Sequence, residues 1–135
     1  MSPDSRRAQV AREVEKGTHS LEAGEQLLRV GLHDDAVTRF YYAAFHFASA
    51  ALLTEGIEAS SHHGLMTLFS EHLVRTGALS AARAKDLKRL QGFREAADYD
   101  RAFAFTAEGA EEEAAVARAF VSEMSVLLES RGFGS

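Results

Sequence analysis

Two stretches of the sequence hold the side chains best suited to chemistry on a charged ligand. The first is the run Arg39-Phe-Tyr-Tyr-Ala-Ala-Phe-His46, in which Arg39 and His46 are seven residues apart. On a helix this spacing places both side chains on one face, about 10 Å from each other. A fixed cation and an imidazole there could hold a phosphate and move a proton. The structural alternative is that Arg39 pairs with a carboxylate of a neighbouring helix and that His46 is a hydrogen-bonded interior histidine.

The second stretch is 83–101, which holds six basic residues against four acidic ones in a chain of net charge −5. Within it, Arg94 and Asp98 form an i, i+4 pair, and Tyr99 supplies a hydroxyl close by. Arg101 shares a helix face with Arg94. These residues are candidates for a phosphate site, in which Arg94 and Arg101 supply the positive charge. A solvated helix face that does no chemistry is the alternative.

A third candidate is Ser61-His62-His63-Gly64, where two histidines are adjacent. Neighbouring side chains on a helix point about 100° apart, so the two imidazoles do not easily bind one metal ion. We expect one histidine to cap or pack near a helix start and the other to be solvated. The chain has no cysteine, no Glu-x-x-His pair and no glycine-rich phosphate loop. The sequence therefore predicts no metal site and no cofactor.

The elements that position these residues follow from composition. A chain of 135 residues with 46% hydrophobic and 26% charged side chains is typical of one folded domain, here residues 1–135. Alanine and leucine dominate the apolar residues, and the only proline is Pro3. Helix formers are therefore abundant and strand formers scarce. We expect an all-α domain, an antiparallel up-and-down bundle of about five helices with short connections.

Capping side chains and glycines divide the chain into five helical stretches. The first stretch is 5–30, with Gly31 as its end signal, and the second begins at a cap formed by Asp34 or Asp35 and runs to residue 53. The third extends from Ser61 to Gly77. The fourth is capped by Ser80, and the fifth extends from near Thr106 to Arg131. The second is the most apolar and is expected at the centre. Gly17 and Gly24 lower the helix propensity of the first, and Gly92 in the fourth would permit the close approach of another helix.

The net charge of −5 disfavours a broad electrostatic grip on nucleic acid, so any RNA contact is expected to be local. No apolar run approaches the roughly 18 residues that span a bilayer, and no hydrophobic segment follows the first charges as in a signal peptide. With no cysteine to indicate an oxidising compartment, we expect a cytoplasmic protein without a membrane partner.

Taken together and in this order, the motifs resemble the HEPN domain (higher eukaryotes and prokaryotes nucleotide-binding). The resemblance rests on the Tyr-Tyr-Ala-x-Phe run after Arg39, on the Ser61-His62-His63-Gly64 turn, and on Arg94-Glu-Ala-Ala-Asp98-Tyr99. It covers nearly the whole chain. The similarity is greatest to the small stand-alone prokaryotic branch with the Arg-x-x-x-Asp-Tyr signature.

The resemblance implies a helical bundle that forms a homodimer and is often encoded beside a minimal nucleotidyltransferase as a toxin–antitoxin pair. Active members of the family are metal-independent ribonucleases, with an arginine followed four to six residues later by a histidine. In this sequence Tyr99 stands five residues after Arg94, where that histidine is expected. A tyrosine, with a pKa near 10, is a poor base at neutral pH.

Three functional interpretations follow. In the first, the chain binds a nucleotide or RNA phosphates at a dimer cleft through Arg94, Arg101 and Arg39. In the second, it is a ribonuclease toxin that uses Arg94 with Asp98 and Tyr99, or Arg39 with His46. In the third, Arg39 and Asp98 form an interhelical ion pair and the motifs record packing alone.

Overall fold

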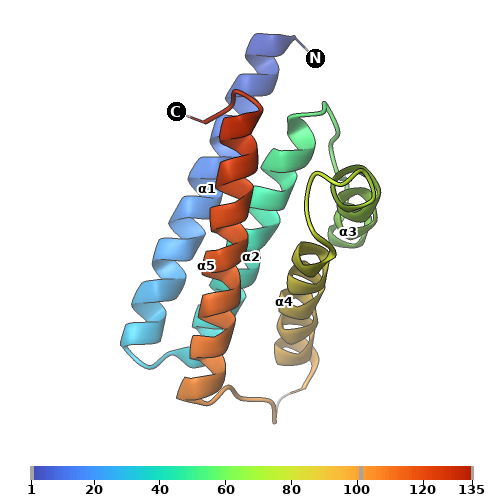
Figure 1. Ribbon diagram of the computed structural model, residues 1–135. Coiled ribbons are helices and arrows are strands. Elements are labelled where there is room, and N and C mark those ends of the chain that lie inside the picture. Colours follow the sequence, from blue (N-terminus) through green and yellow to red (C-terminus); the bar gives the residue numbers. More distant parts are fainter. Residues whose placement is uncertain (1, 101, 135) are drawn as a thin grey trace.

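The computed structural model describes residues 2–100 and 102–134, and in these residues it contains five α-helices. They are α1 (Pro3–Arg29), α2 (His33–Leu53), α3 (His62–Phe69), α4 (Ala81–Tyr99) and α5 (Ala107–Ser130), and a π-helical segment, Ser70–Val74, extends α3. In Figure 1, α1, α2, α4 and α5 run alternately down and up, whereas α3 is seen almost end-on beside α2 and α4. The prediction of an all-α antiparallel bundle is confirmed.

Most helix ends lie where capping residues and glycines predicted them. Ser61 and Thr106 accept the backbone N–H groups of Gly64 and Gly109, at 2.9 and 3.0 Å, and so cap α3 and α5. Gly31 follows α1 with a φ of 82°, in the left-handed region that ends many helices. The local chemistry of the sequence therefore determines these boundaries.

The start of α2 differs from the predicted one. Its N-cap residue is Leu32, and Asp34 and Asp35 lie in the first turn, where the helix dipole favours negative charge. The Asp34 carboxylate accepts the backbone N–H of Phe105 at 2.7 Å. The predicted aspartate cap is therefore wrong, because Asp34 joins α2 to the segment before α5 instead. Ser80 does occupy the N-cap position of α4, although its side chain makes no capping hydrogen bond there.

The hydrophobic core is built around α2, as its apolar sequence predicted. This helix buries most of its residues, and Phe40, Tyr41 and Leu52 are among its largest fully buried side chains. It contacts each of the other four helices. None of the described helices combines the length and the apolarity that a bilayer span requires.

Two glycines let α1 lie close to α2. A Cβ added to Gly17 would lie 2.5 Å from Cδ2 of Phe47, and one added to Gly24 would lie 2.6 Å from Cε1 of Phe40. Both glycines lower the helix propensity of α1, but each leaves room for a phenylalanine ring. A Cβ added to Gly92 in α4 would meet nothing within 4 Å. The close approach predicted at Gly92 is therefore not found among the described residues of this chain.

Gly24→Ala is expected to lower the free energy of unfolding by about 1–3 kcal/mol, because the added methyl group must displace the Phe40 ring in a packed core. Gly92→Ala is the matched control and is expected to raise that free energy by up to about 1 kcal/mol through helix propensity. Urea denaturation followed by circular dichroism measures both changes. Equal changes of the same sign would contradict the packing of α1 described above.

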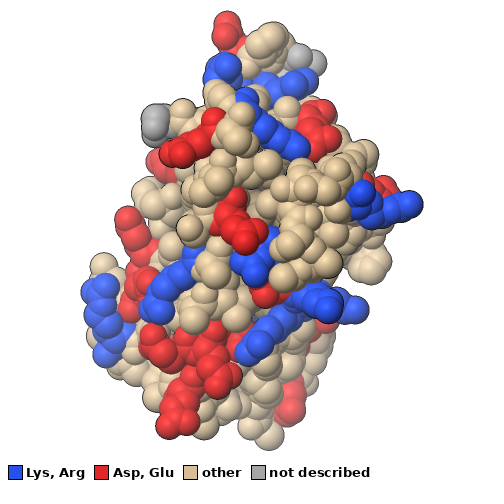
Figure 2. All heavy atoms as spheres, viewed as in Figure 1, with Lys and Arg blue, Asp and Glu red and all other residues tan. Residues whose placement is uncertain are grey.

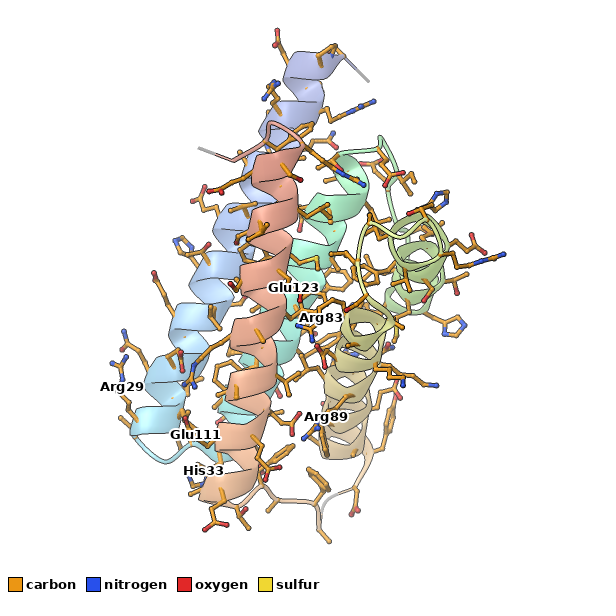
Figure 3. The ribbon with its side chains drawn as sticks, in the orientation of Figure 1. Arg29, His33, Arg83, Arg89, Glu111 and Glu123 are labelled. Carbon is orange, nitrogen blue, oxygen red and sulfur yellow. The ribbon has the colours of Figure 1, made fainter. Side chains whose placement is uncertain are left out.

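Ion pairs join α4 to α5. The Arg89 guanidinium donates to both carboxylate oxygens of Glu113, at 2.8 and 2.6 Å, and Glu113 is only 1% exposed. Arg83 lies 3.1 Å from Asp86 on its own helix and 3.6 Å from Glu123 of α5. Figure 3 shows these arginines between the two helices, and in Figure 2 acidic side chains gather over the start of α5 beside basic ones over α4. Two of the basic residues on α4 therefore have structural partners.

Candidate functional site

Arg94 of α4 lies on the aromatic side chains of α2. Its guanidinium carbon is 5.5 Å from the ring centroid of Tyr41 and 5.7 Å from that of Tyr42, within the range of a cation–π interaction. The Arg94 side chain is 26% exposed. Burial against the two rings therefore restrains this cation, while part of it still faces solvent.

The Arg94 guanidinium keeps most of its hydrogen-bonding capacity. Its Nε lies 3.8 Å from Oδ2 of Asp98, whose side chain is 56% exposed. An ion pair of this length in solvent contributes at most about 1 kcal/mol. Within the part of the chain that the structure describes, the guanidinium makes no other ion pair and no hydrogen bond. Arginine has five N–H donors in a planar fork that matches a phosphate, so Arg94 is suited to bind one.

His62, the first residue of α3, packs on the same group of rings. Its imidazole stacks on the Phe45 ring, with 4.4 Å between the ring centroids. It also stacks on the Tyr41 ring, with 5.7 Å between the centroids. The Tyr41 hydroxyl and Nδ1 of His62 are hydrogen-bonded. The Ser61 cap fixes the start of α3 and hence the position of this histidine. Tyr41 therefore contacts both His62 and Arg94.

Burial determines the charge state of this pair. It lowers the pKa of His62, and the positive charge of Arg94 and that of His46 lower it further, so that the imidazole is neutral near pH 7. Burial also raises the pKa of Tyr41 to about 12, which keeps the phenol protonated. If the phenol donates to Nδ1, then Nε2 of His62 carries the proton and is a donor. If Nδ1–H donates to the phenol oxygen, then Nε2 is a free base.

The structure gives Arg39 and His46 different surroundings, although they share a helix face. Arg39 is exposed, with its guanidinium carbon 5.9 Å from the ring centroid of Tyr42. His46 instead faces α1, where its Nδ1 lies 2.7 Å from Oε2 of Glu13. No third ligating side chain completes a metal site with this pair in the described ranges. Arg39 therefore contacts Tyr42, as Arg94 does, and His46 has a carboxylate partner of its own.

The remaining candidates lie at the end of α4. Asp98 contacts Arg94 only through the 3.8 Å pair, and an Arg39–Asp98 ion pair does not occur among the described residues. Tyr99 is the last residue of α4 and is 86% exposed, so its phenol is outside the aromatic group. Arg101 lies outside the described residues. Arg94 and Arg39 thus share one contact, the Tyr42 ring, and Tyr99 is apart from it.

Sequence reasoning did not assign His62, Tyr41 or Tyr42 to a site. It did predict one packed and one solvated histidine, and this is confirmed, since His62 packs and His63 is exposed. The pattern of each helix shows which residues share a face but not which face meets another helix. The only sequence signal was the position of two histidines beside a capping serine.

The helical bundle belongs to a known class of protein: the chain is a member of the HEPN domain family. The model of that family matches residues 10–127, which extends from α1 to α5 and includes the aromatic run of α2, His62 and Arg94. The resemblance inferred from the motifs is confirmed.

Within the family, the chain is similar to proteins from archaea and bacteria. It is 34% identical to "Putative toxin MJ0142" of Methanocaldococcus jannaschii, over 73% of this chain and 67% of that protein. It is 30% identical to a UPF0332 protein of Thermotoga maritima, over 81% of this chain and 83% of that protein. A second M. jannaschii protein, "Putative toxin MJ0605", is 33% identical over 64% of each chain.

Proposed function

We propose that this chain is the HEPN subunit of a cytoplasmic toxin–antitoxin system and that it binds the phosphate of a nucleotide or RNA at Arg94. The observation that carries the proposal is the half-buried guanidinium of Arg94, held on two tyrosine rings with a single solvated carboxylate beside it. The toxin association is supported by the names of two relatives.

The chemistry around Arg94 favours an anion. Arg39 contacts the Tyr42 ring as well, so two cations contact this tyrosine. Neutral His62 adds an Nε2–H donor when its Nδ1 accepts from Tyr41. Because the chain is acidic overall, its attraction for phosphate depends on this local group of donors.

Two partners belong to the proposal. A second copy of the chain would form a cleft at Arg94, and this partner is proposed from the family resemblance. The minimal nucleotidyltransferase partner is proposed from the family resemblance alone.

Ribonuclease activity is the second candidate, and the position of His62 favours it. An unprotonated Nε2 could take the proton of a ribose 2′-hydroxyl as its oxygen attacks the adjacent phosphorus. Arg94 would stabilise the charge on the phosphorane oxygens, and the departing 5′-oxygen would take a proton from an acid or from water. The products are a 2′,3′-cyclic phosphate and a 5′-hydroxyl. This assigns the base to His62 instead of Tyr99 or His46.

Calorimetric titration of the purified protein with uridine 3′-monophosphate tests the binding function, for which we expect saturable binding that inorganic phosphate displaces. Absence of binding at millimolar ligand would refute it.

Incubation with RNA in EDTA tests the second candidate, since cleavage should leave cyclic phosphate ends. Intact RNA at high protein concentration would count against ribonuclease activity and leave the binding function standing.

A further inference from the structure

A groove of about 730 Å³ adjoins the stacked pair of His62 and Phe45. Residues of α2 line it, with the first half of α1 on one side and residues 57–60, just before α3, on the other. We name it the α1–α2 groove. Its volume is within the range of sites that hold small organic molecules.

Phe45 links this groove to the candidate phosphate site. The ring stacks on His62 at 4.4 Å and also lines the groove, and the His46 ring meets its edge at 5.4 Å. Phe45 is therefore shared by the groove and by the stack that holds His62, which places the groove next to the candidate phosphate site.

Most of the polar side chains that line the groove make no hydrogen bond or ion pair with the described residues. Arg12 and Lys16 are exposed and lie one turn apart on α1, and Ser49 contributes a hydroxyl from α2. In residues 2–100 and 102–134 none of these three side chains has an ion-pair or hydrogen-bond partner. Of the two acids, Glu13 is paired with His46, which leaves Glu58 on the opposite wall. Arg12 and Lys16 are therefore the groove's cations that no described side chain pairs with, and they are available to bind a phosphate.

We propose that the α1–α2 groove is a second subsite, which takes the neighbouring nucleoside of an RNA chain whose phosphate is bound at Arg94. This rests on the proposed function and specifies its ligand as a single-stranded ribonucleotide chain of two or more residues. Phe45 and Leu53 offer apolar surface to a base. Ser49 and the His46–Glu13 pair offer hydrogen-bonding groups to the base or the ribose. Arg12 and Lys16 offer positive charge to the next phosphate.

The test compares the affinities of uridine 3′-monophosphate and a tetrauridylate, measured by calorimetry. Wild-type protein is expected to bind the tetranucleotide at least about tenfold more tightly, the effect of one further base and phosphate contact. Arg12→Glu is expected to bring this ratio close to one while the affinity for the mononucleotide changes little. Arg29→Glu is the matched control, because it makes the same charge change on an exposed residue at the other end of α1.

Equal affinities of the wild-type protein for the two ligands would overturn the subsite. So would equal losses for Arg12→Glu and Arg29→Glu, since these would reflect net charge alone. If the wild-type protein binds neither ligand, the phosphate site at Arg94 fails and the subsite fails with it. Lys16→Glu provides a second groove variant, exposed like Arg12, in case the first does not fold.

Discussion

Replacing Arg94 with alanine is expected to weaken the binding of uridine 3′-monophosphate by about 100-fold, because two charge-assisted hydrogen bonds of at least about 1.5 kcal/mol each are lost. The fold should persist. The substitution removes an ion pair of 3.8 Å with a solvated carboxylate and the cation–π contacts with Tyr41 and Tyr42. Together these contacts contribute about 1–2 kcal/mol to the free energy of unfolding. Calorimetry and thermal unfolding of the same sample measure the two effects.

Two further variants make the Arg94 result specific. Arg94→Lys keeps the charge but loses the planar fork, so we expect an intermediate affinity. Arg118→Ala removes an arginine that pairs with Glu25 across α5 and α1, and should leave the affinity unchanged. A folded Arg94→Ala protein that binds like the wild type would show that the site is misassigned. An unfolded one would show that Arg94 is a packing residue, as in the third interpretation of the sequence.

For the ribonuclease candidate, His62→Gln is expected to slow RNA cleavage by at least about 100-fold, the usual contribution of a general base. His63→Gln is the matched control, since this neighbouring histidine is exposed and should not affect the rate. The measurement is the rate of cyclic phosphate formation in EDTA. Equal rates for the two variants would remove His62 from the mechanism.

The pH dependence of cleavage provides an independent check on His62. A base acts when it is unprotonated, and the pKa of His62 is lowered by burial and by the charges of Arg94 and His46. The rate should therefore stay constant as the pH falls from 8 through the ordinary histidine range near 6.5, and decline only below it. A decline that begins at or above that range would identify a different base.

The sequence predicted those parts of the fold that depend on local chemistry. Ser61 and Thr106 cap helices because their hydroxyls reach backbone N–H groups three residues ahead, and Gly31 ends α1 because it adopts a positive φ. The central place of α2 followed from its apolar residues. The family followed from the order of the motifs.

What the sequence could not predict depends on contacts between helices. Asp34 was expected to cap its own helix, but it bonds to the backbone of Phe105, 71 residues later. From the sequence, Gly24 only lowers the helix propensity of α1, but in the structure it leaves the space that the Phe40 ring occupies. The stacking of His62 on α2 likewise depends on how α3 crosses the bundle, which no spacing within one helix reveals.

We propose that Arg94 and His62 belong to one phosphate site. Nitrogen-15 NMR of the histidine rings during titration with uridine 3′-monophosphate tests it directly. We expect the ring resonances of His62 to shift and to saturate with the Kd found by calorimetry, while those of His63 stay in place, and we expect the His62 shift to be lost in Arg94→Ala. If the ligand binds and the His62 resonances do not move, His62 is not part of the site that binds the phosphate.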